Sequence, residues 1–245
     1  MKSIADYDQD IQQDPNNAEL YRLRGIAYSD QGNADQAIAD YNFALKLDPN
    51  SAKVYNSRGW EYRNKGDIDR AIEDFDQSIK LDPNSAIPYY NRGLAFQIKD
   101  DPERAVKDYS RAIEIDPKDA QSYFNRGGIY TQSGFGCLYG KNDIDRGIAF
   151  YDRAISDFNK AIEIDPNNAM VYAYRGLAYM DGKKDIDQAT KDFDQAIRID
   201  PNYATAYSSR GGAYREKRTL IGQLQILIKH YNWIQIAYKH IIDVP

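Results

Sequence analysis

Residues 52–83 read AKVYNSRGWEYRNKGDIDRAIEDFDQSIKLDP, and the whole chain is built on the pattern that they contain. In the first half, apolar and small side chains recur at helical spacing, and Gly66 is a residue type that often ends a helix. Asp67 then suits the N-cap of a second helix, whose apolar stripe comprises Ile68, Ala71, Ile72, Phe75 and Ile79. Pro83 cannot continue that helix. The stretch therefore predicts two antiparallel helices joined by a short turn.

The same pattern returns along the chain at a nearly constant interval. The closing proline recurs with one fixed spacing at Pro15, Pro49, Pro83 and Pro117, then after one longer interval at Pro166 and after one nearly regular interval at Pro201. Each unit also contains a Tyr, an Arg-Gly pair, a second aromatic, an Ala and an Asp-aromatic pair. A fixed period of this length indicates a solenoid, in which each unit buries its apolar face only against its neighbours.

This pattern resembles the tetratricopeptide repeat, whose signature places an aromatic, Leu-Gly, Tyr, Ala, Phe and Pro over about 34 residues. In the quoted stretch those positions hold Tyr55, Arg58-Gly59, Tyr62, Ala71, Phe75 and Pro83. The departure is Arg where the family usually has Leu. The resemblance covers roughly residues 2–217. It implies an all-α fold, a right-handed α-solenoid (superhelix) of antiparallel helix pairs, with the first helix of each pair lining a concave groove.

The repeats divide the chain into an array, expected over 1–217, and a C-terminal segment. The array consists of a half repeat (2–17), the full repeats 18–51, 52–85, 86–119, 120–168 and 169–203, and the first helix of a sixth (204–217). Residues 218–245 follow as a degenerate C-terminal helical cap, rich in Ile and apolar on both sides. Since end caps usually present a polar outer face, this segment suggests self-association into a homo-oligomer. A degenerate sixth hairpin is the alternative.

Composition narrows the classes of function. The 245 residues include 42% hydrophobic and 28% charged residues, as in a soluble helical protein. The net charge of −5 argues against nucleic-acid binding, where a basic footprint is expected. The lone Cys137 cannot form an internal disulfide and fits a reducing compartment. With no apolar run of about 20 residues and no signal core at the N-terminus, we expect a cytoplasmic protein without a membrane span.

An arginine precedes the central glycine of every first helix. We call this set the Arg ladder; it comprises Arg24, Arg58, Arg92, Arg126, Arg175 and Arg210. A guanidinium that faces inward needs a partner. Candidate partners recur before the second-helix aromatic, at Asp40, Asp74, Asp108, Asp157 and Asp192. Because a binding site is seldom copied six times, the ladder predicts one structural Arg–Asp ion pair per repeat rather than a row of anion sites.

The predicted function is a non-enzymatic protein–protein interaction scaffold that binds a peptide or partner segment in the concave groove. First-helix segments carry net positive charge and second-helix segments net negative charge, which mildly favours acidic partner segments. Aromatic and Arg residues are common at interface hot spots. The candidate groove residues are Arg22, Lys53, Asn56, Trp60, Arg63, Tyr90, Asn91, Leu94, Phe124, Asn125, Tyr174 and Leu177.

Repeat 120–168 is longer than the others, since its closing Pro166 comes later than the period requires. We expect its second helix to be extended by about two turns and the turn around 131–142 to be enlarged into a flexible protrusion. Its tip, with Phe135, Cys137, Leu138 and Tyr139, could touch a partner or serve an enzyme-associated role. No catalytic constellation, metal-ligand spacing or cofactor motif accompanies it, so the expectation is no enzyme, no cofactor and no metal.

Overall fold

The computed structural model describes residues 2–141 and 143–242, and beyond residue 221 the side chains that it describes are those of Ile228 and Tyr231. Within these ranges the chain is helical and contains no strand, which confirms the predicted all-α class. The chain divides into two compact units, Met1–Arg126 and Gly127–Pro245.

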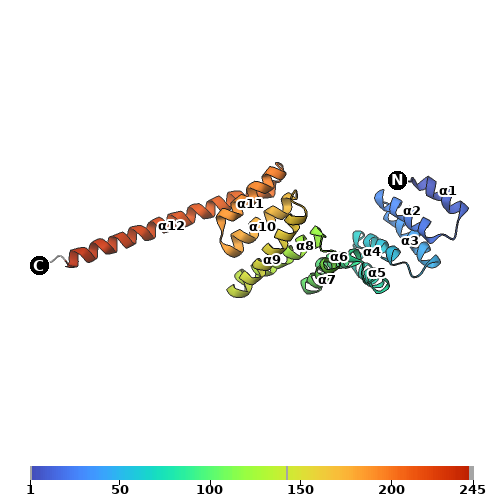
Figure 1. The fold of residues 1–245 in the computed structure, drawn as a ribbon, viewed down its shortest axis with the longest axis horizontal. Helices are drawn as coiled ribbons and strands as arrows, with labels where there is room; N and C mark the ends of the chain where they lie inside the picture. Colours follow the sequence, from blue (N-terminus) through green and yellow to red (C-terminus); the bar gives the residue numbers. More distant parts are fainter. Residues whose placement is uncertain (1, 142, 243–245) are drawn as a thin grey trace. The chain divides into compact units, whose positions relative to one another are not determined.

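The first unit is a series of antiparallel helix pairs (Figure 1). Its helices are α1 (Ile4–Gln13), α2 (Ala18–Asp30), α3 (Ala34–Leu47), α4 (Ala52–Asn64), α5 (Ile68–Leu81), α6 (Ala86–Ile98), α7 (Pro102–Ile115) and the start of α8 (Ala120–Phe135). Within repeats, α2 packs on α3, α4 on α5, and α6 on α7. Between repeats, each second helix also contacts the next first helix, and α4 contacts both α2 and α6.

The second unit continues with longer and less regular helices. It contains the rest of α8, the π-helix η1 (Gly136–Gly140), α9 (Ile144–Ile164), α10 (Ala169–Ala178), the π-helix η2 (Tyr179–Lys183), α11 (Ile186–Ile199) and α12 (Ala204–Ile242). Here α10 packs between α9 and α11, and α12 packs on α11.

The helix boundaries follow the predicted local signals. The Asp67 side chain accepts a hydrogen bond from the Arg70 backbone N–H at 3.2 Å and so caps α5. The same capping bond forms at the start of later second helices, from Asp101, Asp143 and Asp185. Gly66 has φ +83°, the left-handed conformation that glycine adopts without steric cost. Each turn between paired helices is therefore set locally.

Glycine lies at the centre of the first helices because the second-helix aromatic ring touches their backbone. A Cβ added at Gly59 would lie 2.8 Å from Phe75 Cε1 and 3.1 Å from the Ala71 carbonyl oxygen. An aromatic ring takes the same place against Gly25, Gly93, Gly127 and Gly176. Close approach of the second helix therefore explains the glycine, and the nearest atoms belong to the aromatic ring.

Gly59→Ala should therefore lower the free energy of unfolding by about 1–3 kcal/mol, since an extra methyl group overpacks this contact. The matched control is Gly128→Ala in α8, where no atom lies within 4 Å of an added Cβ. That change should instead raise stability by up to about 1 kcal/mol through helix propensity. Urea denaturation of both variants tests the pair, and effects of the same sign would contradict the packing explanation.

The long repeat is extended by added helix rather than by a protrusion. Helix α9 has 21 residues where α5 has 14, which confirms the predicted extension by two turns. The expected flexible turn at 131–142 is wrong, because α8 runs to Phe135 and η1 follows directly. The reason is that two added turns repeat the close contact: Gly134 faces Tyr151 just as Gly127, one heptad earlier, faces Phe158. Cys137, expected at an exposed tip, is buried.

The C-terminal segment continues the last first helix. Helix α12 runs unbroken over 39 residues, so the alternative of a sixth hairpin is wrong for the described chain (Figure 1). Much of the predicted apolar surface of 218–245 falls on side chains outside the described residues. Among those described, Leu220, Ile221, Ile228 and Tyr231 are exposed.

Candidate partner-binding surface

The Arg ladder forms the predicted ion pairs. Arg58 donates from Nε and Nη2 to the two carboxylate oxygens of Asp74, at 2.8 and 2.6 Å. The same paired bonds join Arg24 to Asp40, Arg92 to Asp108 and Arg175 to Asp192. The Asp40 and Asp8 hydrogen bonds raise the pKa of the Arg24 guanidinium against the opposing effect of burial. Because the aspartates are buried, the ladder is structural and is not a row of open anion sites.

Each ladder arginine also bonds back to the second helix of the preceding repeat. Arg58 donates Nη1 to the Asn42 side-chain oxygen at 2.6 Å. The acceptors of this third bond are Asp8, Asn42, Asp76, Ser110, Asn159 and Asp194. Sequence reasoning missed them, although a short hydrogen-bond acceptor always stands two residues after the aspartate position. A guanidinium such as that of Arg58 therefore joins three helices.

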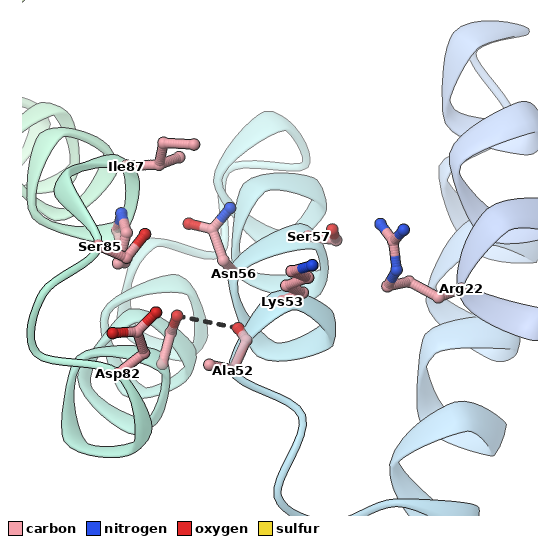
Figure 2. Close-up of a pocket in the computed structure, with 10 residues that line it drawn as sticks. Arg22, Ala52, Lys53, Asn56, Ser57, Asp82, Ser85 and Ile87 are labelled. Atoms are coloured by element: carbon pink, nitrogen blue, oxygen red, sulfur yellow. Dashed lines mark hydrogen bonds between the residues drawn. The ribbon is translucent and has the colours of Figure 1, made fainter. Parts of the chain in front are cut away.

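A pocket of about 280 Å³ opens on the first unit between α2, α4 and the start of α6 (Figure 2). Arg22 reaches it from α2, Lys53 and Asn56 from α4, and Ile87 from α6. Asp82 lies at the far side of the pocket from Arg22 in Figure 2. Three of the predicted groove residues, on two successive first helices, thus share one concave site.

The two cations of the pocket differ in how they are held. Arg22 donates to both carboxylate oxygens of Glu19 at 2.7 and 2.5 Å, which fixes its guanidinium. Lys53 is exposed and forms no ion pair among the described residues. The pocket therefore offers an anionic group one guanidinium held by Glu19 and one exposed ammonium without an ion pair among the described residues.

Polar side chains connect neighbouring first helices beside the pocket. Asn91 Nδ2 donates to Asn56 Oδ1 at 3.0 Å, and Asn125 Nδ2 donates to the Tyr90 hydroxyl at 3.3 Å. Asn91 is only 4% exposed, which corrects its place among the candidate surface residues. Its amide instead orients Asn56, which lines the pocket.

Trp60 and Arg63 form the next feature along α4. The Arg63 guanidinium lies 3.9 Å from the Trp60 ring centroid, a cation–π arrangement, and burial lowers the Arg63 pKa. Tyr90 on α6 is half-buried, and burial raises its pKa. These three predicted residues present flat, partly exposed π surfaces, which suit contact with another polypeptide.

The remaining candidates are half-buried and serve packing as well as surface. Leu94 and Phe124 lie on α6 and α8, while Tyr174 and Leu177 belong to α10 in the second unit. Leu177 packs against the core cluster around Phe193. The structure therefore groups the first-unit candidates more clearly than those of the second unit.

Glu61 carries a buried carboxylate that was not predicted from the sequence. Its carboxylate is 4% exposed and accepts a hydrogen bond from the Ser29 hydroxyl at 2.6 Å. The equivalent position is Ala or Ile in the other repeats, at Ala27, Ala95, Ile129, Ala178 and Ala213. A single acidic residue in an otherwise apolar position was the available signal. Its bond to Ser29 links α2 and α4.

Other kinds of site lack support among the described residues. They contain no group of three His, Cys, Asp or Glu side chains placed to hold a metal ion. None of the described helices combines the length and hydropathy needed to cross a bilayer.

Sequence profiles described as tetratricopeptide repeat match 18–51 and 86–119, 41–73, and 171–203. A further profile, described as TPR repeat, matches 59–100 and 151–182. Together these matches span well over half of the chain. No curated protein matches it.

Solved structures also resemble this chain in fold. A MamA crystal structure is 30% identical over 74% of this chain and 96% of its own, with a TM-score of 0.62. YrrB, described as a TPR protein with an unusual peptide-binding site, is 23% identical over 84% of this chain and 97% of its own, with a TM-score of 0.64. At that identity YrrB supports the fold alone.

Proposed function

Because this chain belongs to the tetratricopeptide-repeat family of protein-interaction scaffolds, we propose that its first-helix face binds an extended segment of a partner protein. The observation that carries the proposal is the pocket on the first unit, where Arg22, Lys53 and Asn56 converge beside the apolar Ile87. An acidic side chain of the partner fits the cationic side of this pocket. The π surfaces of Trp60 and Tyr90 would hold the apolar residues that follow it.

The binding role needs no catalytic group. In the first unit, Arg24, Arg58 and Arg92 are already bonded to their ladder aspartates, so recognition there falls to side chains with unused capacity, such as Lys53. Since Lys53 is exposed, its attraction for an acidic segment should act mainly at low salt.

A charge reversal at the pocket tests the proposal. Peptides selected from a random display library on the immobilised full chain should bind Lys53→Glu about tenfold more weakly, a loss of about 1.4 kcal/mol. Isothermal titration calorimetry of the synthesised peptides at two salt concentrations gives the measurement. The matched control is Lys46→Glu, an equally charged exposed change on the second helix α3, which should leave affinity unchanged.

A second variant removes the aromatic surface without changing charge. Trp60→Ala with Tyr90→Ala should weaken the same peptides, whereas Phe135→Ala with Tyr139→Ala in the second unit should not. Selected peptides that bind all four variants like the wild type would rule out the first-helix face as the binding site.

Self-association through 218–245 is the second candidate role, supported by the exposed apolar side chains of Leu220, Ile221, Ile228 and Tyr231. Sedimentation velocity of the full chain beside a 1–217 truncation tests it. If the full chain and the truncation showed the same association state at every concentration, 218–245 would be excluded as an assembly surface.

A further inference from the structure

The first turns of α12 form a first helix without the second helix that every other first helix has. Tyr207, Arg210, Gly211 and Tyr214 repeat the first-helix pattern. At Gly176 in α10, the equivalent glycine, an added Cβ would lie 2.7 Å from the Phe193 ring. At Gly211 no atom lies within 4 Å. The aromatic position of this repeat is therefore empty among the described residues.

Arg210 is bonded on one side only. Its Nη1 donates to Asp194 at 2.7 Å, the usual bond to the preceding second helix. Arg175 makes that bond to Asn159 and also donates Nε and Nη2 to Asp192. No described carboxylate takes the latter two positions at Arg210. Its Nε and Nη2 therefore remain available to a further carboxylate.

Helix α1 contains the aspartate–aromatic pair that a second helix would supply to Arg210 and Gly211. It is a second helix, and one repeat period before Asp40-Tyr41 it carries Asp6-Tyr7. Asp8 already fills the backward position of Arg24, which shows that α1 packs on α2 as a second helix does. Asp6 is exposed and bonds only to Ser3 among the described residues. Among the described residues, no first helix presents its Arg-Gly pair to this aspartate–aromatic pair.

Charge favours the same match. Of the three aspartates of α1, Asp8 and Asp10 pair with Arg24 and Lys2, which leaves Asp6. The segment 210–218, RGGAYREKR, has four cations and one acid, and its Arg215 and Arg218 form no ion pair among the described residues. Tyr207 and Tyr214 are 43% and 52% exposed beside Gly211, so the receiving face is also apolar. A cationic rim around an apolar strip complements an acidic helix with a central tyrosine.

We propose that α1 of one copy docks on the first turns of α12 of a second copy, with Asp6 on Nε and Nη2 of Arg210 and Tyr7 over Gly211. The contact repeats the way Asp192 and Phe193 meet Arg175 and Gly176 within the chain. Because the two surfaces differ, the association is heterologous and joins copies head to tail. It does not depend on the binding of a partner segment proposed above.

The test uses the full chain and a side chain added to the empty position. Wild-type molar mass in sedimentation velocity should rise with concentration. Gly211→Leu fills the space that Tyr7 requires and should weaken association at least about tenfold. Since nothing contacts that position within the chain, the variant should fold normally by circular dichroism. The control is Gly212→Leu, which places leucine where Leu94 and Leu177 stand in other repeats and should associate like the wild type.

A complementation experiment identifies the two surfaces. Asp6→Arg and Arg210→Asp should each be monomeric alone, because each presents like charges across the contact. Mixed in equal amounts, they should associate again, since the mixture restores the native Asp6–Arg210 pair. Asp6→Asn, which keeps an acceptor for Ser3, controls for loss of the α1 cap. A monomeric wild type, Gly211→Leu that associates unchanged, or a mixture that stays monomeric would overturn the proposal.

Discussion

Asp74→Ala should lower the free energy of unfolding by about 3–5 kcal/mol, one of the two largest losses expected for a single substitution in this chain. Asp74 is 4% exposed and accepts two hydrogen bonds from Arg58. Its removal leaves a guanidinium that is largely enclosed and retains only the neutral Asn42 as an acceptor. Urea denaturation followed by far-UV circular dichroism measures the loss.

Asp76→Ala is the matched control, two residues along the same helix. The Asp76 side chain is 51% exposed and pairs with Arg92, which keeps both bonds to Asp108 when Asp76 is removed. This loss should not exceed about 1 kcal/mol. Asp74→Asn, which retains one acceptor, should fall between the two. Equal stability of the Asp74 and Asp76 alanine variants would show that the ladder pairs do not hold the repeats together.

Phe75→Ala should cost about 3–5 kcal/mol, because the ring fills the space between three helices. Phe75 is fully buried and lies against Gly59 of α4, in a cluster with Ala71 and with Ala95 of α6. Gly59, Ala71 and Ala95 next to the ring are too short to close the cavity that alanine leaves. Thermal and urea denaturation both report the change.

Phe43→Ala provides the comparison with the same change in chemistry. Phe43 is 40% exposed, and its ring contacts Tyr21 with centroids 4.4 Å apart. Its removal uncovers little enclosed space and should cost about 1 kcal/mol or less. A loss as large as that of Phe75→Ala would mean that burial within the helix pair is not what stabilises the repeat.

The helix pairs and the Arg–Asp bonds could be predicted because they repeat. Any one Arg-Gly or Asp-Phe pair is uninformative, but Arg58 and Asp74 stand in a relation that recurs at Arg24 and Asp40 and at Arg92 and Asp108. When two residue types recur at the same spacing in every repeat, the recurrence indicates that they contact each other in every repeat. The period itself therefore carried the information that a single sequence usually lacks.

The features that could not be predicted are those that occur once or vary in chemistry. The third acceptor of the ladder is Asp, Asn or Ser, so its residue type hides a constant geometry. Glu61 looks like one more surface charge until the buried position of Ala95 shows what surrounds it. A flexible turn was expected around 131–142, yet the segment is helical, and Gly134 packs against the Tyr151 ring.

The three hydrogen bonds of Arg58 are divided unequally between the helices before and after it, and this division sets which segments can be deleted. The guanidinium holds the helix before it by one nitrogen and the helix after it by two. Deletion of 52–85 would place Arg92 where Arg58 now donates to Asn42, so the same hydrogen bond could form. Deletion of half that length would instead place two first helices, or two second helices, next to each other. Insertions and deletions of whole repeats should therefore be tolerated, because the contacts between neighbouring repeats stay the same when the number of repeats changes.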